Sequence, residues 1–196
     1  MGKVMTKGIA GLVFLITSVA YCSAEAVFLR QLRRSRPRPY KKGGNNLLIL
    51  YLTLGLVAGV SIGSFYGDFL LFQRGWAVLG IAGWVLLYSG LILRLVSIGT
   101  LRRHYTHSIA ILEGHRLIKE GIYRYIRHPG YLSLLLVFLG IPLAFGSWVG
   151  LIIYGGLAIP LIIHRIRLEE RLLEEHFREE YATYKEKTPC LFPFLH

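Results

Sequence analysis

The chain has 196 residues, 54% of them hydrophobic, and a formal net charge of +12. Several apolar runs approach the roughly 20 residues needed to span a bilayer core, so the composition indicates an integral membrane protein and not an ordinary soluble domain. The basic residues stand between apolar runs, which fits membrane topology better than nucleic-acid binding. The two cysteines, Cys22 and Cys190, have neither zinc-site nor disulfide-framework spacing, and no metal is expected.

The N-terminal half, residues 1–98, contains three predicted transmembrane helices. The basic loop 30–46 follows the first of them, and its prolines predict non-helical backbone. The start of the chain would also fit a cleavable signal peptide. The strongly basic block behind it, however, resists translocation and favours a retained anchor. The three predicted spans are residues 8–28, 47–65 and 76–98.

The second region, residues 99–196, begins with a polar loop, 99–130. The apolar stretches 131–145 and 148–164 are each short for a lone span, and together they predict a helical hairpin that turns at Gly146-Ser147. The amphipathic, charged remainder, 165–196, predicts a C-terminal helix outside the membrane. The predicted fold is therefore an all-α integral membrane protein with about five transmembrane helices, the last two forming the hairpin.

Lysine and arginine set the predicted orientation. Nineteen of the 23 fall in three polar segments, with seven in 30–46, six in 99–130 and six from residue 165 onward. Five spans place all three segments on one side, which the positive-inside rule makes cytoplasmic, with the N-terminus outside. Glu25 and Arg94 are charges within predicted spans, and their roles stay open.

A polar site is predicted where the hairpin begins and ends. A hairpin brings its two ends together, so the stretch from His128 to Tyr131 should lie near Arg165 and Glu169. These last two are i and i+4 on one helix face, close to the bilayer edge, where charge is costly unless it is used or paired. Interfacial anchoring, or ion pairs among the glutamates and arginines of one solvated helix, would also account for these residues.

Two stretches carry a resemblance to a known family. "GHRLIKEGIYRYIRHPGY" and the later "RIRLEERLLEEHFREEYATYKEKTPCLFP" resemble the isoprenylcysteine carboxyl methyltransferases and, more loosely, the phospholipid N-methyltransferases. The resemblance covers roughly residues 108–193, whereas the first three predicted spans share with the family only their apolar character. It implies an integral membrane methyltransferase that uses S-adenosyl-L-methionine, bound in a cytoplasmic pocket formed by the hairpin ends and the C-terminal segment.

The resemblance also implies roles for particular residues. Arg165 would bind the acceptor group and act in catalysis together with Glu169. The chain departs from the family pattern at Ser108, where members often have Gln, and in "FREEY", where they often have Phe-Gly-x-x-Tyr. The implied cofactor-binding residues are His115, Arg116, Leu117, Ile118, Tyr123, His128, Pro129, Gly130, Tyr131 and Glu169.

The chemistry favours an anionic acceptor. A carboxylate is already ionised at neutral pH and needs no general base, whereas an amine must first lose a proton. We therefore expect methylation of an isoprenylcysteine-like carboxylate on a lipophilic small molecule or lipidated acceptor. The alternatives are a phospholipid amine N-methyltransferase, a non-catalytic protein whose basic loop binds anionic lipids, and a transporter subunit, which the lack of readable inverted repeats disfavours.

Overall fold

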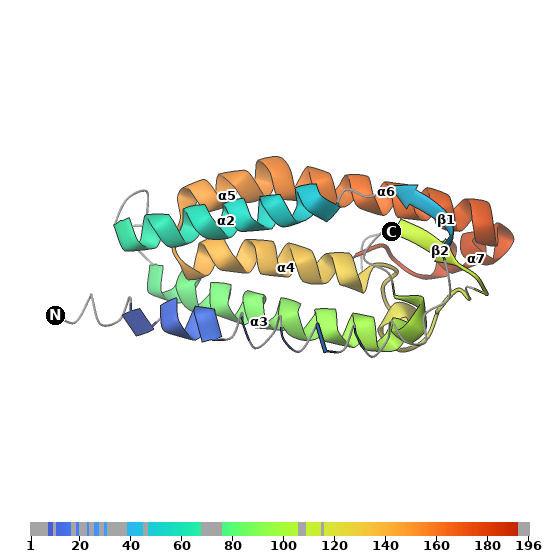
Figure 1. The fold of residues 1–196 in the computed structure, drawn as a ribbon, viewed down its shortest axis with the longest axis horizontal. Helices are drawn as coiled ribbons and strands as arrows, with labels where there is room; N and C mark the ends of the chain where they lie inside the picture. The colour runs from blue at the N-terminus through green and yellow to red at the C-terminus, as the bar shows by residue number, and fades with distance from the viewer. Residues whose placement is uncertain are drawn as a thin grey trace.

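The computed structural model describes most of the chain after residue 38 and fragments of the part before it. Its long helices lie alongside one another, while the strands and the last helix gather at one end (Figure 1). The described residues are 8–9, 11–16, 19, 23, 26–27, 30, 39–44, 47–67, 76–105, 109–114 and 116–191.

The protein is mostly helical, and its described part contains three helices long and apolar enough to cross a membrane: Ile49–Tyr66, Val78–Leu101 and Trp148–Phe177. The first predicted span, 8–28, falls largely outside the described residues, so the count of five stays a prediction. The helices are α2 (Leu47–Gly67), α3 (Trp76–Leu101), α4 (Pro129–Ala144), α5 (Trp148–Ile153), α6 (Ile159–Phe177) and α7 (Glu179–Lys187).

The two arms of the hairpin are unequal. The 16-residue helix α4 ends at a turn in which Gly146 has φ 66° and Ser147 caps α5 by accepting a hydrogen bond from the Gly150 amide. The second arm does not end at residue 164. Helix α5, the π-helical turn η3 (Tyr154–Ala158) and α6 form one helical stretch from Trp148 to Phe177, because the charged residues beyond 164 are good helix formers.

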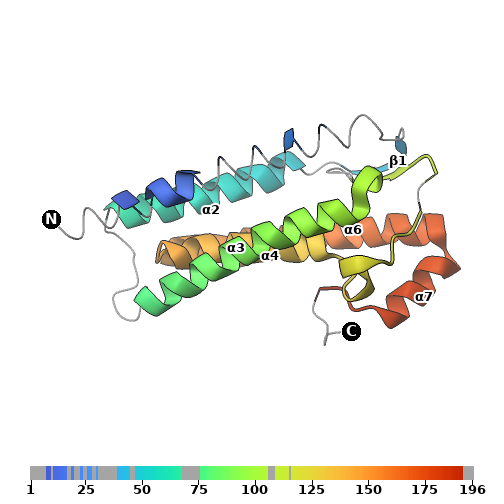
Figure 2. The same cartoon turned by 90° about the horizontal axis from the view of Figure 1, so that it is seen from below.

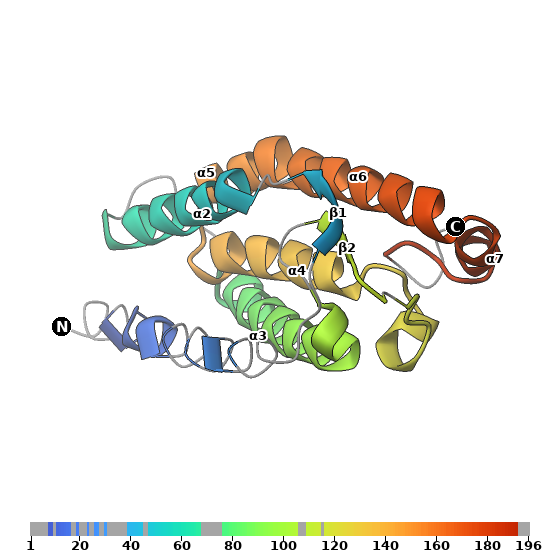
Figure 3. The same cartoon turned by 45° about the vertical axis from the view of Figure 1, so that its right-hand side comes forward.

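The all-α prediction was wrong in one respect, because the chain contains a two-stranded antiparallel sheet. Strand β1 (Pro39–Gly44) lies in the predicted basic loop and pairs with β2 (Ile109–Leu112) in the predicted polar loop. All four β2 residues are buried, and Ile109 and Ile111 pack with Leu172 of α6. Figure 3 shows the two strands beside α6. A four-residue buried strand shows no alternation that would predict it from sequence.

Helices α3 and α4 pack with their backbones in direct contact, and they cross closely in Figure 2. A Cβ atom added to Gly83 would stand 2.2 Å from the Ala144 amide nitrogen, and one added to Gly140 would stand 2.6 Å from the Leu87 nitrogen. Small residues at such contacts let membrane helices approach closely. This packing fixes α4, whose first residues belong to the site described below, against α3.

Arg178, between α6 and α7, has φ 47° and ψ −118°, a conformation that strongly favours glycine. It is the position at which the resembled family often has glycine. We expect Arg178→Gly to raise the free energy of unfolding by about 1 kcal/mol, because the strain exceeds the added chain entropy of glycine. Thermal unfolding in detergent measures this change.

The matched control is Arg171→Gly, an exposed position inside α6. There glycine should lower the stability by about 1 kcal/mol, since it weakens a regular helix. A loss of similar size at both positions would show that the backbone at Arg178 is not strained.

Candidate active site

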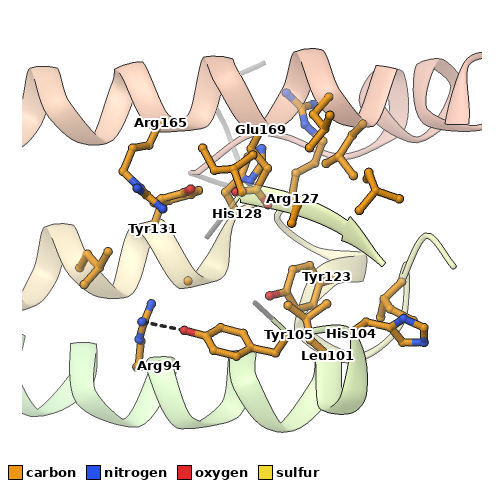
Figure 4. Close-up of a pocket in the computed structure, with 18 of the residues that line it drawn as sticks. Arg94, Leu101, His104, Tyr105, Tyr123, Arg127, His128, Tyr131, Arg165 and Glu169 are labelled. Atoms are coloured by element: carbon orange, nitrogen blue, oxygen red, sulfur yellow. Dashed lines mark hydrogen bonds between the residues drawn. The ribbon is translucent and has the colours of Figure 1, made fainter. Parts of the chain in front are cut away.

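One pocket collects residues from α2, α3, β2, α4, α6 and α7 at the end of the molecule that holds the strands. Its apolar wall includes Leu50 and Leu54 of α2 and Leu134 and Phe138 of α4. Figure 4 shows its polar side chains, which extend from helices on opposite sides of the cavity. The pocket can therefore take a ligand that is apolar in one part and polar in another.

Arg165 and Glu169 reach this pocket from one face of α6, as their i, i+4 spacing predicts. Arg165 is only 2% exposed, and its guanidinium carbon lies 5.9 Å from the centre of the Tyr131 ring. The Tyr131 hydroxyl interacts with both Arg165 and Glu169. A cation, a carboxylate and a phenol thus meet beside the apolar wall.

Arg94 lines the same pocket from α3, on the wall opposite α6 (Figure 4). Its Nη2 donates a hydrogen bond of 2.8 Å to the Tyr105 hydroxyl. A Cβ atom added to Gly130 would lie 3.9 Å from the Arg94 Nη1, so this guanidinium lies beside the start of α4. The sequence left the role of Arg94 open, and the fold places it at the site. Glu25 lies outside the described residues.

Glu170, the neighbour of Glu169, is the centre of a second polar cluster, which we call the latch. Arg127 donates to its Oε1 from Nε at 3.1 Å and from Nη2 at 2.9 Å. His128 Nε2 lies 3.3 Å from the same oxygen, and Lys185 Nζ lies 3.2 Å from Oε2. Glu170 therefore joins the start of α4 to the end of α7, rather than pairing with an arginine of its own helix.

The backbone extends the latch. The Arg127 and His128 amides donate to the carbonyls of Pro189 and Cys190, and Arg127 Nη1 donates to the carbonyls of Lys185 and Thr188. These bonds hold the C-terminal segment against the stretch that leads into α4. The segment that carries His128 is therefore held by the Glu170 side chain of α6 and also by the backbone carbonyls of Pro189 and Cys190.

Two tyrosines of the pocket wall stay neutral. The Tyr184 hydroxyl donates to the Tyr123 carbonyl, and burial raises the pKa of Tyr184 to about 12. Burial also raises the pKa of Tyr123 well above its usual value. Both phenols are therefore hydrogen-bond donors at every physiological pH.

His128, Glu170 and Cys190 have ligand atoms within 4.8 Å of one another, as a metal site would require. The Glu170 carboxylate, however, is already engaged by Arg127 and Lys185. A metal ion would be repelled by those two cations, so we assign none to this cluster.

The structure brings most of the sequence-predicted site residues to one pocket. Pro129 is instead a buried first residue of α4 behind the lining, and Arg116 is exposed. His115 and Ser108 lie outside the described residues. The predicted residues in the lining are Leu117, Ile118, Tyr123, His128, Gly130, Tyr131, Arg165 and Glu169.

Sequence reasoning assigned no role to Arg127, Glu170, Tyr181 or Tyr184, all of which form the latch or the pocket wall. A signal was present for three of them. Arg127 precedes His128 in the Arg-His-Pro motif, Glu170 completes the Glu-Glu pair, and Tyr181 is the tyrosine of the FREEY stretch. Tyr184 gave none, because the direction of its ring is decided by the fold of the C-terminal segment.

The fold and the pocket define a helical membrane protein with a buried site between apolar and polar walls. Residues 82–175 match the model of the isoprenylcysteine carboxyl methyltransferase (ICMT) family. The resemblance seen in the sequence is thereby confirmed.

Curated relatives and a solved structure agree with this match. The chain is 31% identical to protein-S-isoprenylcysteine O-methyltransferase B of Arabidopsis thaliana over 58% of each chain. It is 30% identical to the protein-S-isoprenylcysteine O-methyltransferase of Saccharomyces cerevisiae over 59% of this chain and 49% of that protein. The fold is shared with the eukaryotic intramembrane Ras methyltransferase ICMT, with a TM-score of 0.63 and 21% identity over 78% of this chain and 55% of that one. The chain thus spans less than two thirds of the length of these relatives.

Proposed function

We propose that the protein is an integral membrane methyltransferase that uses S-adenosyl-L-methionine to methylate the carboxylate of a lipophilic, isoprenylcysteine-like acceptor. The observation that carries the proposal is the meeting of Arg165 and Glu169 at the boundary between the apolar and polar walls of one pocket. The names of the curated relatives support the reaction and the acceptor class.

The polar part of the pocket suits the methyl donor. The donor carries a primary ammonium group and a sulfonium, and the Glu169 carboxylate is placed to bind the ammonium. The rings of Tyr123 and Tyr131 offer aromatic faces to a cation. When bound, S-adenosyl-L-methionine would supply a methyl group activated by its positively charged sulfur.

The opposite part of the pocket suits a lipophilic acid. The apolar wall would bury the hydrocarbon part of the acceptor, and Arg165 would orient its carboxylate through charge-assisted hydrogen bonds. Arg94 adds a second positive charge from the opposite wall, which favours an anionic acceptor over an amine. An ionised carboxylate needs no general base, so holding the two reactants in line is the main task of these residues.

Location follows from the same proposal. Strands β1 and β2 and helix α7, each part of one of the three basic segments, gather at one end of the long helices (Figure 1), and the positive-inside rule assigns such segments to the cytoplasm. A water-soluble donor would enter there, whereas the acceptor would arrive from the bilayer beside α2 and α4.

Calorimetric titration of the detergent-purified protein with S-adenosylhomocysteine tests the proposal. We expect wild type to bind the ligand and Glu169→Ala to lose that binding, because the ammonium group loses its partner. Glu186→Ala, an exposed glutamate of α7, is the matched control and should bind as wild type does. A well-folded wild type that binds no S-adenosylhomocysteine would refute the proposed function.

A further inference from the structure

Tyr181 is a buried phenol in the pocket wall whose hydroxyl has no hydrogen-bonding partner among the described residues. The residue lies on α7, is 1% exposed, and packs its ring edge-on against Tyr184 at a centroid distance of 6.1 Å. Buried hydroxyls are usually paired, and an unpaired one calls for an explanation such as a missing ligand.

Tyr184 provides the comparison within the same helix. It is one turn further along α7, is similarly buried, and donates its hydroxyl to the Tyr123 carbonyl. Both tyrosines belong to the residues that line the pocket, and they differ in one respect, which is that the buried hydroxyl of Tyr181 has no partner among the described residues.

The surroundings of Tyr181 say what kind of group it can bind. Burial and the neighbouring carboxylates of Glu170 and Glu169 raise the pKa of Tyr181 far above its usual value, so the phenol is neutral and donates its proton. The charges of Glu170 and Arg127 balance each other, so the remaining carboxylate, that of Glu169, disfavours an anionic ligand group at this point. A neutral hydrogen-bond acceptor fits.

The position of Tyr181 selects the ligand. The apolar wall of the pocket packs on Ile162 and Ile166 in the first half of α6, whereas Tyr181 follows the far end of that helix, beyond Leu172. The lipophilic acceptor belongs to the first end and the water-soluble donor to the second. We propose that Tyr181 donates a hydrogen bond to a neutral acceptor atom in the nucleoside half of the methyl donor, an inference that rests on the proposed function.

The test compares Tyr181→Phe with wild type in two measurements on the whole 196-residue chain in detergent. The first is the calorimetric affinity for S-adenosylhomocysteine and for 5′-methylthioadenosine, which shares the nucleoside but lacks the amino-acid part. We expect both affinities to fall about tenfold, the usual size of one lost hydrogen bond in a buried site. The second is the unfolding temperature without ligand, which should stay equal or rise, because the variant removes an unpaired hydroxyl.

Tyr184→Phe is the matched control. It leaves the Tyr123 carbonyl without its donor, so it should lower the unfolding temperature of the ligand-free protein. A merely structural role for Tyr181 would produce this same loss of stability, whereas a ligand-binding role would not.

Each other outcome overturns a defined part of the inference. Unchanged affinity of Tyr181→Phe for both ligands would refute the ligand contact, and so would a fall in its ligand-free unfolding temperature matching that of Tyr184→Phe. Weaker binding of S-adenosylhomocysteine alone would refute the nucleoside assignment. If wild type binds neither ligand, the proposed function fails and this inference fails with it. If wild type binds and Glu169→Ala does not, the proposed function stands whatever Tyr181 shows.

Discussion

On the proposed function, replacing Arg165 with leucine is expected to lower kcat/KM for methylation of an S-prenylated cysteine by about 100-fold, because the acceptor carboxylate would lose the group proposed to orient it. Leucine fills most of the volume of a side chain that is 2% exposed, so the fold should survive. Binding of S-adenosylhomocysteine should persist, since Glu169 remains in place. Transfer of a radiolabelled methyl group to N-acetyl-S-farnesylcysteine measures the first effect, and calorimetry measures the second.

Two further variants sharpen this test. Arg165→Lys keeps the charge but loses the planar, bidentate geometry, so its activity should fall between wild type and Arg165→Leu. Arg167→Leu removes an exposed arginine of the same helix and should retain nearly full activity. Arg165→Leu with activity close to that of wild type would show that the carboxylate is oriented by another residue.

The long apolar helices α2 and α3 were predictable from the sequence, because an apolar run of about 20 residues has few stable structures other than a membrane-spanning helix. The predicted spans 47–65 and 76–98 correspond to α2 and α3, which each extend two or three residues further. Helix was predicted on both sides of residue 164, but as a hairpin arm and a separate C-terminal helix, because the sequence changes there from apolar to charged; the structure has one helix, α6, across this point. A change in solvent does not end a helix unless a capping or breaking residue is present.

The strand pair was not predictable by the same reasoning. Residues 39–44 and 109–112 pair across more than sixty intervening residues, and β2 is stabilised by its contact with α6 rather than by any local pattern. Pro39 begins β1, a position where its missing amide hydrogen is tolerated. Only the folded chain brings these two segments together.

The candidate site was partly predictable for a topological reason. A hairpin must bring its two ends together, and the structure does place Tyr131 beside Arg165 and Glu169. The direction in which each glutamate points was not predictable. Glu169 and Glu170 are adjacent in sequence, yet one lines the pocket and the other binds Arg127. Successive helix residues differ by about 100° in direction, so the neighbours of each are set by distant segments.

Removing Glu170 should cost more stability than removing any exposed charge of the chain's C-terminal segment. Its side chain is 14% exposed and that of Arg127 is 8% exposed, so Glu170→Ala leaves a largely buried guanidinium without its carboxylate. We expect a loss of about 3 kcal/mol in the free energy of unfolding, at the lower end of the range for breaking buried pairs. Thermal or denaturant unfolding in detergent measures it, and Glu186→Ala, an exposed control, should stay within about 0.5 kcal/mol of wild type.

A double-mutant cycle with Arg127→Ala separates the ion pair from the rest of the latch. Arg127→Ala should destabilise more than Glu170→Ala, because the carbonyls of Lys185 and Thr188 also lose their donor. The double variant should cost less than the sum of the two single losses, with a coupling of about 1–3 kcal/mol. Strictly additive losses would show that the two side chains do not stabilise each other.

The same variants tell whether the latch matters for ligand binding as well as for folding. The Glu170 Oε1 lies 3.3 Å from the His128 Nε2. Together with Arg127, Glu170 holds the C-terminal segment, which contributes Tyr184 to the pocket wall. Glu170→Ala should therefore also weaken binding of S-adenosylhomocysteine at temperatures well below unfolding, because the segments that form the pocket are no longer held together. Full-strength binding by a destabilised Glu170→Ala protein would mean that the pocket forms without the latch and that Glu170 serves stability alone.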